Sequence, residues 1–176
     1  MSKLLPTREQ ALQLLHENHC SAQVIAHCEA VAKLAKETAE VCKKKGLKVN
    51  VELVEIGALL HDLGRSKTHS VHHAVAGVEI AKKAGLSEPV IAIIKRHVGG
   101  GITTAEAAEL GWPEDNYVPV TLEEKIVSYA DKLVETSERV PIEMTINKLR
   151  EEKLDAAAER VQKIHFEIAQ IVGDKP

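Results

Sequence analysis

The sequence predicts an all-α fold, a single bundle of about seven or eight helices. Apolar residues recur with the helical period in every well-defined segment, capping residues mark the boundaries, and no segment alternates with period two, so no sheet is expected. A chain of 176 residues is long enough for one domain with one good core, and neither a repeat nor a linker divides it. We therefore expect one domain over residues 1–176, with a core at about 21–139 and a C-terminal helical extension at about 142–172.

Capping signals locate the first helices. Thr7 stands three residues before a glutamine, which is the capping-box pattern at the start of a helix. A second helix is expected over about 21–45 and ends at Gly46, because glycine readily adopts the left-handed conformation that closes helices. Asn50 can cap a third helix, which we expect to end near Gly64.

Periodicity predicts the later helices, several of which end at glycine. Residues 72–85 and 87–97 carry apolar stripes, and residues 104–111 fit a short helix. Thr121 begins a second capping box, which predicts a long helix that continues to about residue 139. One or two further helices, set off from the core by a proline, complete the chain and offer a packing face for a homo-oligomer.

The composition excludes several classes of protein. Net charge is −3 and aromatic residues make up 2% of the chain, so neither a basic field nor stacking platforms predict a nucleic-acid surface. No apolar run reaches the ~18 residues of a membrane span, and the start of the chain lacks the apolar stretch of a secretory signal. The three cysteines form no C-x-x-C, which argues against a disulfide framework or a cysteine-based zinc site. We expect a cytoplasmic protein without a membrane partner.

Six side chains of metal-ligand type fall where apolar stripes should face the core. They are His27, His61, Asp62, His73, His97 and Asp131. A single histidine on an apolar face is usually a hydrogen-bonded core residue, but two buried carboxylates and four buried imidazoles need more compensation than protein hydrogen bonds readily supply. A divalent cation supplies it, because it favours deprotonated ligands. Imidazole with carboxylate suits Mn, Fe, Co, Ni or Zn, and Mg could be recruited by the carboxylates together with a phosphate substrate.

The order of these residues resembles a known signature. His27, the pair His61-Asp62 and Asp131, each on a predicted helix, are similar to the H…HD…D pattern of the HD-domain superfamily of metal-dependent phosphohydrolases. The letters "HDLG" resemble the HDIG form of its motif, and the resemblance covers roughly residues 21–139. It implies an HD-domain-like helical bundle with a divalent metal held by the four residues of the signature.

A second metal is also implied by the resemblance, with Asp62 as the bridge. "HAVAG", which begins at His73, and "IKRH", which ends at His97, resemble the family elements that complete this second site. Relatives with two metals often carry two adjacent histidines at the position of His97, whereas Val98 follows here, so one or two ions are both expected outcomes. His72 would point ~100° away from its neighbour on a helix, and the H-x-x-x-G spacing favours His73 as the ligand.

The resemblance implies an enzyme that cleaves a phosphomonoester or phosphodiester by attack of metal-activated water, and a nucleotide is the expected substrate. His61 and Asp62 would be the central catalytic residues. Four cations close to the signature are candidates for binding the substrate phosphate: Arg65, Lys67, Arg96 and Lys132. No residue stands out as a proton donor to the leaving group, and His69 lies in a polar loop that could reach the pocket mouth.

Several alternatives remain open at this stage. A nucleoside monophosphate phosphatase, a cyclic-nucleotide phosphodiesterase and a dinucleoside polyphosphate hydrolase all fit the pattern. A non-catalytic metal or nucleotide sensor on the same fold is a second hypothesis, and a purely structural role for the histidines is a third. The glycine run in "VGGGIT" lacks the ending and the preceding strand of a phosphate-binding loop, so we interpret it as a flexible helix terminus that shapes the pocket.

Overall fold

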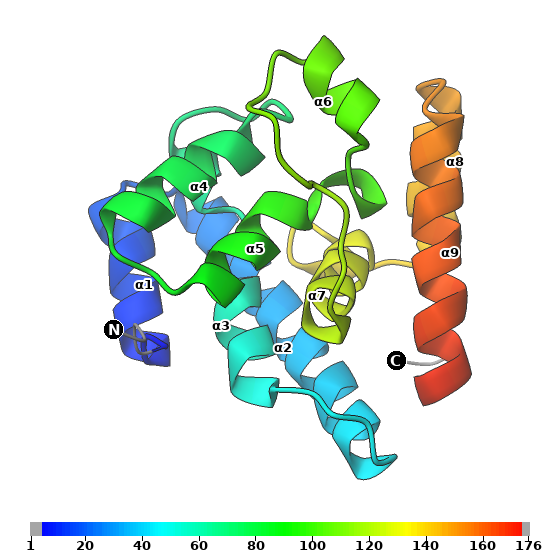
Figure 1. Cartoon of the computed structure of the whole chain (residues 1–176). Coiled ribbons are helices and arrows are strands. Elements are labelled where there is room, and N and C mark those ends of the chain that lie inside the picture. Colours follow the sequence, from blue (N-terminus) through cyan, green and yellow to red (C-terminus); the bar gives the residue numbers. More distant parts are fainter. Residues whose placement is uncertain (1–4, 174–176) are drawn as a thin grey trace.

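Helices make up most of the computed structural model, which describes residues 5–173 (Figure 1). The described helices are α1 Arg8–Glu17, α2 Ala22–Lys44, α3 Val51–Leu60, η1 Leu63–Ser66, α4 His73–Lys83, α5 Glu88–Arg96, η2 Val98–Gly100, α6 Thr104–Glu109, α7 Leu122–Lys132, α8 Ile142–Glu151 and α9 Asp155–Val172, where η marks a 3₁₀ helix. An antiparallel hairpin of β1 (Val134–Glu135) and β2 (Glu138–Arg139) separates α7 from α8. Residues 1–4, part of the segment in which we expect no secretory signal, and residues 174–176, the end of the expected domain, lie outside the described range.

The predicted caps begin the helices. The hydroxyls of Thr7 and Thr121 each accept a hydrogen bond from the backbone N–H three residues further on, and both capping boxes are complete. The side chain of Asn50 accepts a hydrogen bond at 3.0 Å from the backbone N–H of Leu53 at the start of α3. Gly46 follows α2 with φ of 87°, the left-handed conformation expected at a helix end. The all-α class is therefore confirmed.

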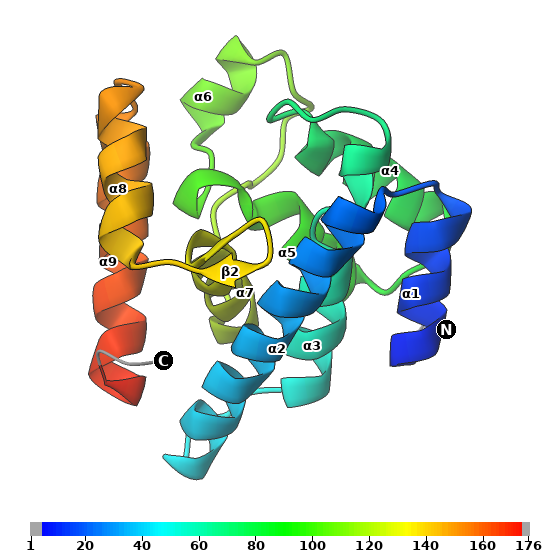
Figure 2. The same cartoon turned by 180° about the vertical axis from the view of Figure 1, so that it is seen from behind.

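Four helices form the centre of the bundle. α2 lies along α3, and α7 packs against α2, α3 and α5 (Figures 1 and 2). Fully buried apolar side chains lie between these four helices, among them Val31 of α2, Leu59 of α3, Ile94 of α5 and Ile126 of α7. Burial of one such side chain stabilises the fold by about 1.5–3 kcal/mol. α1 covers α3 on the outside, while α4 packs against α5 and η1.

The last two helices form a layer along one side of the bundle (Figure 1). α8 and α9 pack against each other, and α9 also contacts α2, α7 and η2. The approach at η2 is close: a Cβ on Gly100, whose φ is 72°, would lie 2.9 Å from the backbone nitrogen of Val161. The glycine run beside His97 is thus packed tightly against α9, which corrects its interpretation as a flexible helix terminus.

Two helix ends and the number of helices differ from the prediction. α3 ends at Leu60, because the chain tightens into η1 before Gly64. α7 ends at Lys132 rather than near residue 139, because the chain reverses through the hairpin with Thr136 in the left-handed region at φ of 56°. The expectation of no sheet is wrong to this small extent, since strands of two residues are too short to show an alternating pattern. The described residues hold nine α-helices instead of seven or eight.

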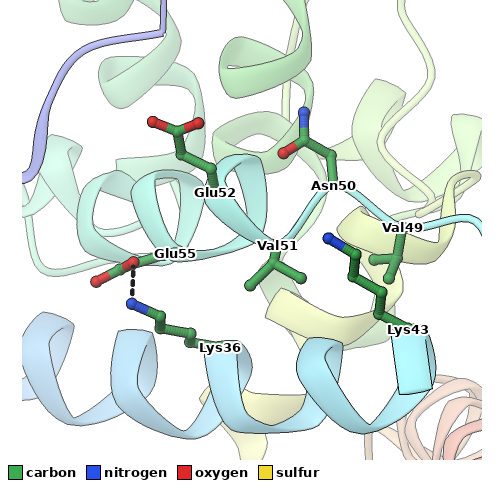
Figure 3. Close-up of a pocket in the computed structure, with 7 residues that line it drawn as sticks. All are labelled: Lys36, Lys43, Val49, Asn50, Val51, Glu52 and Glu55. Atoms are coloured by element: carbon green, nitrogen blue, oxygen red, sulfur yellow. Dashed lines mark ion pairs between the residues drawn. The ribbon is translucent and has the colours of Figure 1, made fainter.

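A hollow lies between α2 and the start of α3 (Figure 3). The ion pair between Lys36 Nζ and Glu55 Oε2 crosses one end of it at 2.8 Å. The other side chains that line it are Lys43, Val49, Asn50, Val51 and Glu52. None of the six predicted metal ligands contributes to this hollow, so it is separate from the site described below.

Two further expectations concern membranes and cysteines. Within residues 5–173, no helix combines the length and the apolar character that crossing a bilayer requires. Cys20, Cys28 and Cys42 are all buried and form no disulfide with one another, as expected of cysteines that act as small apolar side chains.

Candidate metal centre

The fold brings all six predicted ligands to one place. They come from five parts of the chain: α2, the end of α3, the start of α4, the end of α5 and α7. His61, Asp62, His73 and His97 are buried, and their exposed fractions do not exceed 4%. His27 and Asp131 are half-buried at the edge of the cluster. A set of titratable groups gathered this deeply requires electrostatic compensation.

One half of the cluster surrounds Asp131. Its Oδ1 lies 3.0 Å from His27 Nε2 and 3.2 Å from His61 Nε2. The same two nitrogens each lie 3.6 Å from Asp62 Oδ2. These four residues match the H…HD…D signature, and the contact between α2, α3 and α7 is what assembles them.

The other half of the cluster surrounds the second oxygen of Asp62. Its Oδ1 lies 3.1 Å from His73 Nε2 and 3.3 Å from His97 Nε2. The two imidazole nitrogens are themselves 2.9 Å apart. The neighbouring His72 points elsewhere, because its Nδ1 accepts a hydrogen bond at 2.8 Å from Trp112 Nε1. Asp62 therefore faces two groups of ligands, one with each oxygen.

All four histidines of the cluster have their Nδ1 bound to a backbone carbonyl. The distances are 2.7 Å for His27 to Thr136, 2.6 Å for His61 to Ala58, 2.7 Å for His73 to Ser70 and 2.7 Å for His97 to Ile94. A carbonyl oxygen only accepts, so each Nδ1 carries the hydrogen and donates it. In the neutral ring the lone pair then sits on Nε2, which is the arrangement found around histidines that bind metals.

This arrangement fits a divalent cation. The lone pairs of imidazole nitrogens and carboxylate oxygens face one another across 2.9–3.6 Å, which is favourable only when positive charge lies between them. Among the described residues, His61 Nε2 is a fully buried atom without a hydrogen-bond partner. Ligand atoms of His27, His61 and Asp131, and those of His61, Asp62 and His97, lie within 4.8 Å of one another. Nitrogen and oxygen donors of this kind suit the transition metals and zinc.

Burial and neighbouring charges set the ionisation of the cluster. Burial opposes charge on the His61 ring, but the carboxylates of Asp62 and Asp131 outweigh it and raise the pKa of His61 to about 9. Burial lowers the pKa of His97 to about 4. Burial would raise the pKa of Asp62, yet the imidazoles around it hold that pKa well below its ordinary value. Lys132 and His61 likewise outweigh burial and hold the pKa of Asp131 well below its ordinary value, so both carboxylates are ionised at neutral pH.

Glycines in "HDLG" and "HAVAG" allow the two segments to meet. A Cβ on Gly64 would overlap the carbonyl oxygen of His73, and one on Gly77 would lie 2.8 Å from Ile94 Cγ2. The absence of side chains at these two positions lets η1 pack directly on α4. This contact brings His73 against Asp62. It explains why glycine stands two residues after Asp62 and four residues after His73.

The four candidate phosphate ligands divide into two pairs. Arg65 Nε donates a hydrogen bond to Asp62 Oδ2 at 3.0 Å, and Lys132 Nζ lies 2.6 Å from Asp131 Oδ2; both side chains line the cavity beside the cluster. Arg96 does not, because its guanidinium is bound to the buried carboxylate of Glu124 at 2.9 Å. Lys67 is exposed and also lies outside the cavity lining.

A cavity of about 730 Å³ opens onto the cluster. His73, His97 and Asp131 form part of one wall, and His69 lies on the lining as the sequence suggested for the pocket mouth. Sequence reasoning missed the opposite wall, which comes from α6, α8 and α9. Its members are Glu106, Glu109, Leu110, Lys148, Leu149, Glu152, Leu154, Ala157 and Arg160. Their separation from the motifs along the chain carries no signal that they would face the same cavity.

Arg160 ties this wall to the loop after His97. Its Nε donates a hydrogen bond to the carbonyl oxygen of Gly101 at 3.1 Å, and its Nη2 lies 2.9 Å and 2.8 Å from the two carboxylate oxygens of Glu106. The carboxylate of Glu106 also accepts a hydrogen bond at 2.7 Å from the backbone N–H of Thr103 at the start of α6. One guanidinium therefore connects α9, α6 and the glycine loop.

Comparison with known sequences identifies relatives. The family model described as "HD domain" matches residues 24–135. An uncharacterized protein of Methanocaldococcus jannaschii is 46% identical over 164 residues, which are 93% of this chain and 92% of that protein. A tRNA (cytidine(56)-2'-O)-methyltransferase of Picrophilus torridus is 39% identical over 97% of this chain. The chain spans about half of that relative, 49% of its length.

Comparison with solved structures identifies a similar fold. The HD domain of the phosphodiesterase PgpH from L. monocytogenes superposes with a TM-score of 0.57 at 19% identity, over 92% of this chain and 95% of that domain. The same domain in complex with cyclic-di-AMP gives a TM-score of 0.56 at 18% identity, over 94% of this chain and 96% of that domain. At this level of identity the likeness concerns the arrangement of the helices.

Proposed function

Because the chain belongs to the HD domain family, we propose that it is a metal-dependent phosphohydrolase that cleaves a phosphomonoester or phosphodiester of a nucleotide. The observation that carries this proposal is the pair of ligand groups on the two oxygens of Asp62. One group would hold a first cation through His27, His61, Asp62 and Asp131, and the other would hold a second through Asp62, His73 and His97. A divalent cation in such a site lowers the pKa of water and offsets negative charge on a phosphoryl group.

The protein itself contributes the position and charge of these ligands. The backbone carbonyls that hold each Nδ1 keep the Nε2 lone pairs directed inward, so little reorganisation is needed when charge enters the site. Arg65 and Lys132 line the cavity next to the carboxylates and could each pair with a phosphate oxygen. His61 is fully buried, whereas His73, His97 and Asp131 line the cavity.

A nucleotide substrate is supported by analogy. The structurally similar domain of PgpH is named as a phosphodiesterase and has been solved with cyclic-di-AMP. The cavity of about 730 Å³ falls within the usual range for small-molecule sites. Among nucleotides, the phosphatase, phosphodiesterase and dinucleoside polyphosphate hydrolase alternatives all remain within the proposal.

A non-catalytic metal- and nucleotide-binding module is the second candidate. One observation favours it: the Picrophilus torridus relative, about twice as long as this chain, is named for methyl transfer and not for phosphate hydrolysis. A domain of this family can thus occur in a protein named for another reaction. The intact set of six ligands favours the enzyme, since a binding module has less need for two complete groups around one carboxylate.

A panel of substrates separates the two candidates. The purified protein would be incubated with Mn²⁺, Co²⁺, Ni²⁺ or Mg²⁺ and with p-nitrophenyl phosphate, bis(p-nitrophenyl) phosphate, nucleoside monophosphates and cyclic dinucleotides. The proposal expects cation-dependent release of product that Asp62→Asn abolishes and Asp115→Asn preserves, because Asp115, which pairs with Lys95, lies outside the cavity lining. Nucleotide binding without turnover of any compound would favour the binding module instead.

A further inference from the structure

The wall opposite the metal ligands comes largely from a part of the chain that the family match does not include. The match ends at residue 135, whereas α8 begins at Ile142 and α9 at Asp155. Both helices, together with α6, face the cavity that opens onto the cluster, and Figure 1 shows α6 at the top of the bundle, beside the upper end of the α8–α9 layer. Most of this wall therefore lies outside the residues that the family model matches, although α6 lies within them.

Seven aliphatic side chains of the described part of the chain line this cavity. They are Val71, Val98, Ile102, Leu110, Leu149, Leu154 and Ala157, and we call them the aliphatic wall. Phenylalanine, tyrosine and tryptophan are absent from the lining among the described residues. The wall therefore offers van der Waals contact and removal of apolar surface from water, without an aromatic platform for stacking.

Two of these side chains are exposed to an unusual degree for their size. Val71 is 41% exposed and Leu154 is 47% exposed, and both lie on the cavity lining. The other large apolar side chains that are exposed in residues 5–173 are Val120, Met144 and Phe166, which lie outside this cavity. Exposed apolar surface beside a polar reaction centre is typical of a ligand-binding groove.

The charged groups on the same wall are partly engaged with one another. Arg160 is bound to both carboxylate oxygens of Glu106 and to the carbonyl of Gly101, so these groups already have partners. Lys148 is 67% exposed and approaches Glu135 at 3.9 Å. The cations that accompany the cluster, Arg65 and Lys132, are at the opposite side with the metal ligands. The cavity lining thus combines cations beside the metal ligands with the aliphatic wall, and the carboxylates of Glu106, Glu109 and Glu152 also lie on it.

We propose that the aliphatic wall is the subsite for the organic group of the phosphoester substrate, an uncharged group of the size and polarity of a nucleobase. This inference rests on the proposed function, because it takes the phosphate to lie at the ligand cluster. The organic group is held by apolar contact and shape. Buried hydrogen-bonding groups give the strongest discrimination between similar ligands, and apolar contacts give much less. Purine and pyrimidine nucleosides therefore bind within about tenfold of each other.

The experiment uses nucleosides, which carry no phosphate, and protein without added cation, so that binding is measured without hydrolysis. Adenosine, uridine and ribose would be titrated into the isotopically labelled chain, and amide chemical shifts would be followed by NMR. We expect the shifted amides to gather at residues 98–102 and 149–157, similar affinities for the two nucleosides, and ribose weaker by at least about tenfold.

A double variant and a control variant complete the test. Val71→Asn with Leu154→Asn removes apolar surface without adding charge and should weaken nucleoside binding about tenfold. Met144→Asn is the matched control, because Met144 is 49% exposed on α8 but lies outside the cavity. Shifts that gather elsewhere, no nucleoside binding, or equal weakening by the control would each overturn the subsite. Hydrolysis of p-nitrophenyl phosphate with any of these results would leave the proposed function standing, so the two failures are distinguishable.

Discussion

The Nε2 atoms of His73 and His97 lie 2.9 Å apart, and the Nδ1 of each ring is held by a backbone carbonyl. Two neutral rings fixed in this way turn lone pairs toward each other, which is unfavourable unless a proton or a metal ion lies between them. Burial keeps the pKa of His97 low, at about 4, which leaves a metal ion as the more effective source of positive charge at neutral pH.

Cation binding should therefore stabilise the fold. At a free concentration of about 100 times Kd, a cation that binds only the folded state contributes roughly 2.7 kcal/mol, or a rise in Tm of about 5–10 °C for a chain of this size. Thermal unfolding with Mn²⁺, Zn²⁺ or a chelator measures the shift. Asp62→Asn should remove it and Asp115→Asn should retain it, and an equal shift in both variants would contradict the proposed site.

Gly64→Ala should be among the most destabilising glycine substitutions. The new Cβ would overlap the carbonyl oxygen of His73, which cannot move without displacing α4, so we expect a loss of roughly 3 kcal/mol. Gly111→Ala is the comparison, because its φ is 71° and its surroundings are open, and it should cost only about 1–2 kcal/mol. Urea denaturation of the two variants checks this order, and similar midpoints would show that η1 and α4 can separate freely.

Arg65 and Arg96 should behave differently although both were candidates for phosphate binding. Arg65→Gln removes a cation from the cavity and should raise the KM for p-nitrophenyl phosphate about tenfold, since a charge-assisted hydrogen bond contributes roughly 1.5–3 kcal/mol. Arg96→Gln leaves the buried carboxylate of Glu124 without its cationic partner, so it should lower the free energy of unfolding by roughly 3 kcal/mol and leave KM unchanged. Steady-state kinetics and denaturation on both variants test the contrast, which a raised KM in Arg96→Gln would refute.

Arg160→Lys should loosen the loop that follows His97. Lysine cannot bind both oxygens of Glu106 and the carbonyl of Gly101 at once, because it lacks the planar fork of arginine. We expect faster amide exchange at Gly101 and Ile102 and a severalfold weaker affinity for the cation. Glu167→Gln, which removes an ion pair between α9 and α7, is the control on the same helix. Unchanged exchange in Arg160→Lys would mean that packing of η2 on α9 holds the loop alone.

The ion pair between Glu106 and Arg160 should also give a pH dependence. Burial opposes ionisation of Glu106, but hydrogen bonds from Thr103 and Arg160 outweigh it and lower its pKa from the ordinary value of 4.5. At a pH between the pKa of Glu106 in the folded chain and its pKa in the unfolded chain, the unfolded chain binds more protons. The contribution of Glu106 to the free energy of unfolding is therefore present above pH 4.5 and disappears as the pH falls through the lower pKa of the folded chain. The difference in Tm between the wild-type chain and Glu106→Gln should narrow in acid. A difference in Tm that stays constant from pH 3 to 7 would contradict this account. Glu109→Gln is the comparison, because it removes a negative charge from the same helix.

Periodicity and motif together predicted the helical class and the residues of the ligand cluster. The prediction that His27 and Asp131 face the interior is correct because each residue lies on the apolar stripe of its helix. That stripe is the side of the helix that packs against the core. The hairpin was not predicted, since its two-residue strands are shorter than any recognisable alternation, yet its turn supplies the carbonyl of Thr136 that holds His27. The pairing of Arg96 with Glu124 and the far wall of the cavity depend on contacts between distant segments, which no local pattern encodes.

His61 and His97 each stand at the end of a helix, and each ring holds the carbonyl three residues before it. The last carbonyls of a helix normally need water or another side chain as a partner. At these two positions the same imidazole closes the helix and selects its own tautomer, using main-chain atoms that every amino acid possesses. Substitution of the surrounding side chains therefore leaves the tautomer of these two ligands unchanged, whereas any replacement of either histidine disturbs a helix terminus as well as the metal centre. A lineage that abandoned the reaction would still have a structural reason to keep both rings.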